Sequence, residues 1–264
     1  MLNKNGANRK VYNHLAPAFF VPQHMHYKAL EPNFRDINGS MILNVGFPKS
    51  GNVWLSSLIA CALDLDVCSS ENRCFVSFTH SALDNNILFD PGILRGACLI
   101  RDLRDIVVSL FHYLRSDGFQ TNASPHHIYD NIADMYFHFF VNYYTRYVND
   151  FEGLLDRYVE FGWPVIRYES LYDNPENVLT MLFERWQIPV SSESIKNAVN
   201  QSSMSSMKAG GGKKLNKTTL SHFRKGGYGN YRDELPTEVQ EDIFRRYGDY
   251  LKRWGYSTTP DAAS

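Results

Sequence analysis

The chain has 264 residues, of which 44% are apolar and 21% charged, and its formal net charge is -1. These values are typical of a globular protein with a real core, and they exclude disordered, collagen-like and disulfide-scaffold chains. Because the chain lacks a net positive charge, we expect neither nucleic acid nor a membrane surface as a partner. Four cysteines without a CxxC spacing argue against a disulfide framework and a zinc site, and indicate a reduced, cytoplasmic setting.

The N-terminal region differs from the rest of the chain. Three prolines, Pro17, Pro22 and Pro32, interrupt any helix there. We interpret residues 1–40 as an arm packed on a single domain that spans residues 41–264. No apolar run of signal-peptide or membrane-spanning length occurs in the sequence, which favours a soluble enzyme without a membrane anchor.

From residue 41 onward, short apolar segments alternate with segments of helical periodicity. The apolar segments predict strands over residues 41–47, 74–78, 97–100 and 165–168. The periodic segments predict helices over residues 52–63, 104–115, 125–158, 175–186 and 236–254. This alternation predicts an α/β fold of three layers, α/β/α, with a central parallel sheet.

The turn between the first strand and the first helix reads Phe47-Pro-Lys-Ser-Gly-Asn-Val-Trp54. Backbone N–H groups that lead into a helix N-terminus bind anions, and Lys49 adds a full positive charge. The turn is not a Walker A motif, because its lysine precedes Ser-Gly and no GK[ST] occurs. We predict a P-loop-like loop for an anion other than Mg·ATP; the alternative is a surface turn with a solvated lysine.

Two further segments carry positive charge. Arg101 ends a predicted strand, where ligands bind in open α/β sheets, and Ser109 follows two helical turns later. The alternative is that the charges around Arg101 form only salt bridges. Arg224 and Lys225 precede a cluster of glycines, which suits either a clamp on an anion or a solvated basic loop. The glycine-rich residues at about 203–221 form either a mobile lid or a plain linker.

In chain order, four motifs resemble those of the soluble sulfotransferase family across about residues 41–255: Pro48-Lys-Ser-Gly-x-x-Trp54, Arg101-Asp-x-Arg-Asp-x-x-x-Ser109, Arg167-Tyr-Glu-Ser-Leu171 and Arg224-Lys-Gly-x-x-Gly229. The resemblance implies transfer of a sulfuryl group from 3′-phosphoadenosine 5′-phosphosulfate (PAPS) to a hydroxyl or amine of a small-molecule acceptor. The product nucleotide would be 3′-phosphoadenosine 5′-phosphate (PAP), and no metal would be needed. The short chain looks more like a bacterial or secondary-metabolite member than an animal detoxifying one.

The resemblance also implies a role for individual residues. The 5′-phosphosulfate would be held by Lys49, Ser50, Gly51, Asn52 and Val53. The adenine would be contacted by Trp54, Tyr168 and Ser202. The 3′-phosphate would be held by Arg101, Ser109, Arg224, Lys225 and Gly226. Members of the family usually carry two threonines where this chain has Asn52 and Val53; the asparagine side chain can still donate a hydrogen bond.

Two residues are candidates for catalysis. Lys49 would stabilise charge on the leaving oxygen. His80 would be the general base, because Ser77-Phe-Thr-His80 resembles the family's Lys-Thr-His segment, although Phe78 stands where a lysine is usual. His80 is alternatively a structural histidine. Two other functions share these features: a nucleotide kinase-like P-loop enzyme and a catalytically inactive nucleotide-binding module. The acceptor, O- or N-sulfation and the oligomeric state stay open.

Overall fold

The computed structural model describes residues 41–65, 76–79, 94–116, 129–160, 162–203, 205–206 and 226–258. These residues belong to two compact units. The sheet unit contains the described residues of Gln23–Arg101 and Gly153–Gly227, and the helical unit contains those of Asp102–Glu152 and Tyr228–Ser264. The predicted N-terminal arm at residues 1–40 and nearly all of the predicted lid at residues 203–221 lie outside the described residues.

A four-stranded parallel sheet forms the centre of the sheet unit. Its strands are β1 (Met41–Gly46), β2 (Val76–Thr79), β3 (Leu94–Ile100) and β4 (Val165–Arg167), in the order β2-β1-β3-β4. The predicted α/β class with a parallel sheet is therefore confirmed, and β3 begins three residues earlier than its pattern indicates. In a parallel sheet all carboxyl ends lie at one edge, so the segments that follow β1, β3 and β4 start from the same edge.

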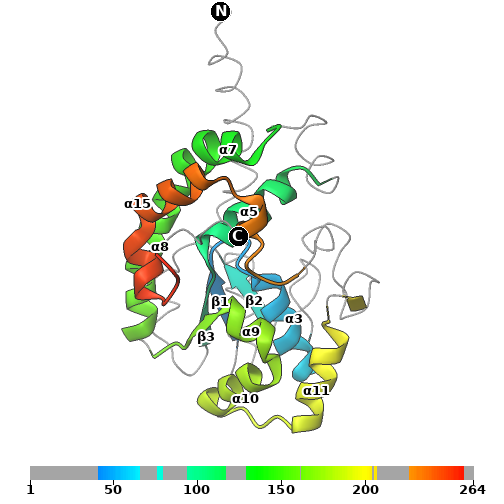
Figure 1. Ribbon diagram of the computed structural model, residues 1–264. Helices are drawn as coiled ribbons and strands as arrows, with labels where there is room; N and C mark the ends of the chain where they lie inside the picture. The colour runs from blue at the N-terminus through cyan, green and yellow to red at the C-terminus, as the bar shows by residue number, and fades with distance from the viewer. Residues whose placement is uncertain are drawn as a thin grey trace, which may run out of the picture. The chain divides into compact units, whose positions relative to one another are not determined.

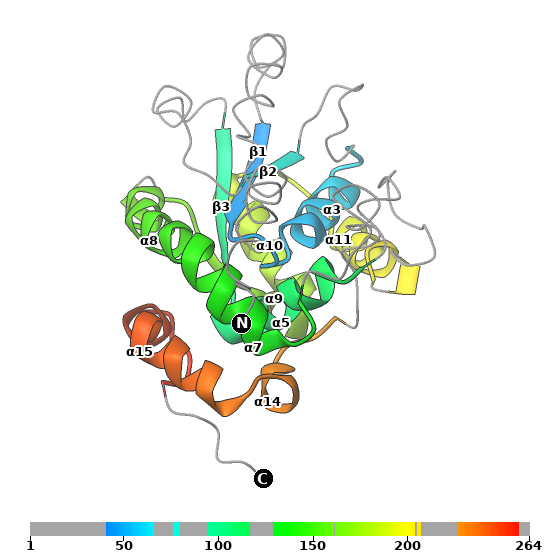
Figure 2. The ribbon, with the colours of Figure 1, turned by 90° about the horizontal axis from the view of Figure 1, so that it is seen from above.

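Apolar side chains cover both faces of this sheet. On one face, Ile42, Ala97 and Leu99 pack against α3 (Asn52–Ala62), α10 (Pro175–Trp186) and α11 (Ser192–Gln201). Figure 1 shows α3 beside β1 and β2, and Figure 2 shows α3 and α11 on the same side of these strands. The opposite face carries Gly96, where a Cβ atom would overlap the ring of Trp163. The sheet is therefore buried on both sides, as continuous apolar strands require.

Local signals explain where the helices of the sheet unit begin. The Asn174 side chain accepts a hydrogen bond from Asn177 N at 3.2 Å, and Pro175 occupies the first turn of α10. The Ser191 hydroxyl caps α11 in the same way, at 3.0 Å from Ser194 N. The short helix α9 (Tyr168–Asp173) follows β4 directly and was not expected, because six residues are too few to show helical periodicity.

The helical unit contains α5 (Leu103–Leu114), α7 (Ile132–Met135), the π-helix η1 (Tyr136–Tyr144), α14 (Tyr231–Glu234), α15 (Thr237–Arg253) and the first half of α8 (Thr145–Glu160). Within it, α5 contacts α7, α14 and α15.

The predicted single helix over residues 125–158 is wrong in two respects. Residues 129–131 are not helical, because the Asn131 side chain accepts a hydrogen bond from Asp134 N at 2.8 Å and caps a helix that starts at Ile132. Further along, η1 interrupts the α-helix: the Asn142 amide donates to the carbonyls of Phe137, at 3.2 Å, and His138, at 2.9 Å. Among the described helices, none combines the length and the apolar character needed to cross a membrane.

The close approach of Trp163 to Gly96 generates a test of the core. We expect Gly96→Ala to lower the free energy of unfolding by about 1–3 kcal/mol, the range for overpacking a core, because the ring or the strand must move. Urea denaturation measures this change. The matched control is Gly153→Ala in α8, where a Cβ would meet no heavy atom within 4 Å. The control should leave stability unchanged or raise it by up to about 1 kcal/mol; equal losses in both variants would contradict this packing.

Candidate functional site

The loop between β1 and α3 has a conformation that suits an anion. Lys49 and Gly51 both adopt left-handed backbone angles, with φ of 73° and 101°. The N–H of Ser50 donates to the carbonyl of Phe47 at 3.1 Å, which closes the turn. The first N–H groups of a helix have no acceptor within it, and Gly51 caps α3 without a side-chain hydrogen bond. The helix therefore directs N–H donors and its positive dipole end toward the loop.

Two buried asparagines hold this loop. The Asn52 amide donates to the carbonyls of Gly46, at 3.2 Å, and Phe47, at 2.8 Å. The Asn44 amide donates to the carbonyl of Asn52, at 3.0 Å, and to the hydroxyl of Ser56, at 2.6 Å. Both amide hydrogens of Asn52 are thus directed at the loop itself. The backbone N–H of Asn52 lies in the first turn of α3, at the same loop.

The charged and polar groups of the loop are poised for an anion. Lys49 is half-buried, and burial together with the neighbouring Arg101 guanidinium lowers the pKa of its ammonium group to about 7. The Ser50 side chain is fully buried, and its hydroxyl has no hydrogen-bond partner among the described residues. Unpaired buried hydroxyls are costly, so an anion at this point would improve the energy of both groups.

Arg101 leaves the carboxyl end of β3 and bridges two segments of the sheet unit. One of its terminal nitrogens donates to the carbonyl of Lys49 and the other to the carbonyl of Gly227, each at 3.0 Å. Its guanidinium lies 4.1 Å from the ring centroid of Tyr168, which is a cation–π contact. The backbone of the loop and that of the glycine segment are therefore joined through one cation.

An aromatic group lies next to the loop. The Trp54 indole donates to the carbonyl of Ser202 at 2.9 Å. Its ring lies edge-on to the rings of Tyr168 and Tyr172, with 5.9 Å and 6.3 Å between ring centroids. A Cβ on Gly51 would lie 2.7 Å from the Tyr168 ring, so only glycine fits there. The three predicted adenine contacts, Trp54, Tyr168 and Ser202, are thus gathered beside the predicted phosphosulfate loop. Tyr172 was missed, because it carries no motif signal.

The remaining predicted residues are distributed as follows. Val53 is half-buried in the first turn of α3, and Gly226, with φ of 71°, is half-buried next to Gly227. Ser109 is half-buried on α5 in the helical unit. The side chains of His80, Arg224 and Lys225 lie outside the described residues. Within the described ranges, no group of three His, Cys, Asp or Glu side chains is placed to hold a metal ion.

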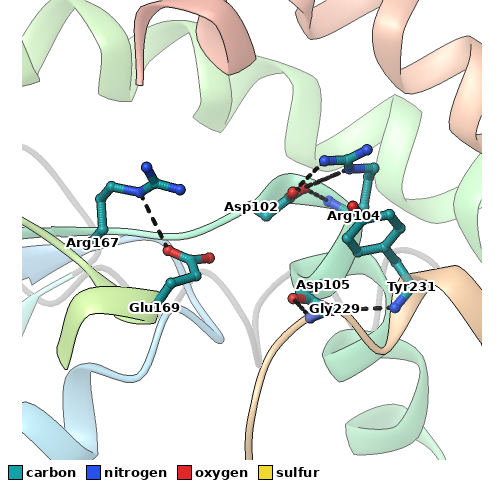
Figure 3. Close-up of polar contacts among 7 residues, drawn as sticks. All are labelled: Asp102, Arg104, Asp105, Arg167, Glu169, Gly229 and Tyr231. Atoms are coloured by element: carbon teal, nitrogen blue, oxygen red, sulfur yellow. Dashed lines mark hydrogen bonds and ion pairs between the residues drawn. The ribbon is translucent and has the colours of Figure 1, made fainter. Parts of the chain in front are cut away.

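The charged residues at the start of α5 form their contacts with other groups of the helical unit (Figure 3). Asp102 forms an ion pair with Arg104 at 2.6 Å, as the salt-bridge alternative predicts. The Asp105 carboxylate instead accepts hydrogen bonds from the backbone N–H groups of Gly229, at 2.6 Å, and Tyr231, at 3.3 Å. In the sheet unit, Arg167 and Glu169 form a longer pair at 3.7 Å. Asp105 therefore fixes the end of the glycine motif, a contact that spacing along the sequence does not reveal.

Comparison with known proteins gives one family and one fold. A sulfotransferase domain model matches residues 94–255, whereas no curated protein matches the sequence. The crystal structure of mouse sulfotransferase SULT7A1 complexed with PAP is 16% identical and covers 81% of this chain and 85% of that chain, with a TM-score of 0.60. A retinol dehydratase complex with androsterone and the inactive cofactor PAP is 14% identical, covers 80% of each chain and has a TM-score of 0.59.

A second retinol dehydratase complex, with retinol and PAP, is 14% identical and covers 85% of this chain and 86% of that chain, with a TM-score of 0.57. Identities this low establish a likeness of fold. The family model reaches further, because it spans more than half of the chain, from the start of β3 to just beyond α15. The resemblance carried by the four motifs is confirmed: the chain belongs to the sulfotransferase family.

Proposed function

We propose that this protein transfers a sulfuryl group from PAPS to a hydroxyl or amine of a small organic molecule and releases PAP. The observation that carries this proposal is the loop between β1 and α3, in which Lys49 and the buried Ser50 hydroxyl lie beside Arg101 and an aromatic group. Such a site suits an adenine nucleotide with several negative charges. The related structures were crystallised with PAP, which supports the same nucleotide here.

The residues fit the nucleotide as follows. Lys49, Ser50, Gly51 and the backbone N–H groups of Asn52 and Val53 would hold the 5′-phosphosulfate. The adenine would meet Trp54, Tyr168 and Ser202, whose mutual contacts form one cluster. Arg101, whose guanidinium donates to the carbonyls of Lys49 and Gly227, would contribute to holding the 3′-phosphate. Assigning Ser109, Arg224, Lys225 and Gly226 to that phosphate rests on the sequence motifs.

The chemistry requires orientation, charge stabilisation and a base. PAPS supplies an activated sulfuryl group, so the transfer needs no metal. Protonated Lys49 would stabilise the negative charge that develops on the oxygen between sulfur and phosphorus. His80 would take the proton of the acceptor as its oxygen or nitrogen bonds to sulfur. In the chain, His80 directly follows Thr79, which pairs with Val45 of β1, close in sequence to the Lys49 loop.

The proposal also covers the type of acceptor and the location of the protein. Androsterone and retinol, bound in two of the related structures, support a small organic acceptor. Cys61 and Cys98 are free thiols, which supports a reducing, cytoplasmic location.

Transfer from radiolabelled PAPS tests the proposed function directly. The protein is incubated with excess EDTA and with phenols, alcohols and amines as acceptors, and labelled products are separated. We expect transfer to at least one acceptor class without metal. Mg²⁺-dependent phosphoryl transfer from ATP in a parallel assay would instead support a kinase-like enzyme and contradict the proposal.

The lowered pKa of Lys49 predicts a pH dependence of nucleotide binding. The free ammonium group titrates at about 7, whereas a bound anion favours the protonated form and raises the pKa. Binding at about pH 8 should therefore take up protons, and affinity should fall as pH rises above 7, by up to about tenfold per unit. Calorimetry in buffers of different ionisation enthalpy measures the uptake.

Lys49→Arg is the matched control for this titration, because arginine stays charged throughout the range. We expect the proton uptake to disappear in that variant. An observed binding enthalpy that is the same in every buffer for the wild-type protein would show that Lys49 does not titrate on binding.

Arg101 should matter for the 3′-phosphate more than for the 5′-group. We expect Arg101→Ala to weaken PAP binding by about 1.5–3 kcal/mol, the range for hydrogen bonds to charged groups. Adenosine 5′-phosphosulfate should lose less affinity, through the missing bond to the Lys49 carbonyl alone. Arg95→Ala is the control: Arg95 lies on the same strand and donates to the Trp186 carbonyl. Equal losses for both nucleotides would contradict a 3′-phosphate contact.

His80→Ala tests the proposed base. We expect the transfer rate to fall by about 10²–10⁴-fold, the usual contribution of a general base, while PAP affinity stays near that of the wild-type protein. His112→Gln is the control, because His112 pairs with Glu234 in the helical unit and should affect stability only. A His80→Ala enzyme with full activity across the pH range would exclude this histidine as the base.

A further inference from the structure

We propose that Asn44, a buried residue of the central strand, is a positioning residue for sulfuryl transfer: acting through Asn52, it sets the conformation of the loop that receives the 5′-group of the nucleotide. The inference rests on the proposed function and adds a residue that no sequence motif contains. Asn44 has no exposed surface and lies under α3, so any effect it has on a ligand must pass through the protein.

Asn44 occupies a fully buried position of the central sheet, where an apolar side chain is expected. β1 reads Met-Ile-Leu-Asn-Val-Gly, and Asn44 pairs with Ala97 on one side and with Phe78 on the other. Burying an amide inside a sheet that is covered on both faces is unfavourable unless the amide forms hydrogen bonds. Both donors of Asn44 go to α3, to the carbonyl of Asn52 and the hydroxyl of Ser56. The first turn of α3 is therefore fixed on the strand by a side chain.

A second amide passes this restraint to the loop. Asn52 donates to the carbonyls of Gly46 and Phe47, where the chain leaves β1. A Cβ on Gly46 would lie 2.5 Å from the Asn52 side-chain oxygen and 2.5 Å from the carbonyl of Leu99. Glycine at position 46 thus leaves the space that the Asn52 amide occupies. The strand end and the helix start are joined by two consecutive amides.

The loop needs such a restraint because of Lys49. Lys49, with φ of 73°, lies in a backbone region that residues other than glycine seldom adopt. Such a conformation persists only where neighbouring contacts enforce it. Arg101 holds the carbonyl of Lys49 from one side, and the asparagine pair fixes the two ends of the loop. Without Asn44, the start of α3 loses its polar restraint on β1, and the loop is held less firmly in the conformation that Lys49 requires.

The experiment compares two ligands that share the adenosine. The full chain carrying Asn44→Val, which has an apolar side chain of similar size and lacks both donors, is titrated with PAP and with adenosine 3′-phosphate in EDTA, below its unfolding temperature. Because only PAP carries a 5′-group, we expect PAP affinity to fall about tenfold or more, as for loss of a buried hydrogen bond. Adenosine 3′-phosphate should change by less than about twofold. Asn44→Ser, which keeps one donor, should show a smaller loss in the same direction and serves if the valine variant does not fold.

Ser57→Ala is the matched control. Ser57 is also buried on α3, and its hydroxyl donates to the carbonyl of Val53 within the helix. We expect this variant to lose stability and to bind both ligands like the wild-type protein. If Asn44 variants weaken both ligands equally, or neither, Asn44 is only structural and the inference is wrong. If the wild-type chain bound no PAP, the proposed function would fall together with the inference.

Discussion

The left-handed conformation of Lys49 is the constraint on which the rest of the candidate site depends. It turns the chain sharply between a buried strand and a helix, so that a lysine and the N-terminal end of α3 belong to the same short loop. The surroundings are built to keep it. Arg101 binds its carbonyl, Asn52 closes the loop, and Gly51 allows the Tyr168 ring to pack directly behind. Removing any of these contacts would let the lysine relax toward an ordinary backbone conformation.

The electrostatics follow from the same arrangement. Lys49 and Arg101 are two cations brought together in a buried setting, and their repulsion adds to the burial that lowers the pKa of Lys49. A polyanionic ligand reverses both effects, because it pairs the charges and replaces lost hydration. Trp54 and Tyr168 supply flat apolar surface beside these cations. Under the proposed function, a phosphorylated adenosine would supply both a ring and several negative charges.

Much of the fold could be predicted from local patterns. The strand, turn and helix around Lys49 follow from apolar runs and a glycine turn, and α10 has its predicted bounds because Asn174 and Pro175 mark its start. The π-helix could not be predicted, since the apolar pattern of a sequence does not distinguish its i→i+5 backbone bonds from those of an α-helix. Arg101 and Asp105 bond to backbone groups more than 100 residues away, and Asn44 bonds to groups of the following helix, so no sequence motif predicts these contacts. Asn52 is the clearest example. Its residue type indicated a donor for the ligand, whereas in the structure its side-chain amide donates to the carbonyls of Gly46 and Phe47.

The central claim is that this loop and its cations bind a doubly phosphorylated adenosine without a metal. Calorimetric titration of the full chain with PAP, in the presence of excess EDTA, tests it most directly. The account predicts saturable binding of one nucleotide per chain that is unchanged when Mg²⁺ replaces EDTA and weakens as the salt concentration rises. No heat of binding, or binding that requires Mg²⁺, would contradict the account.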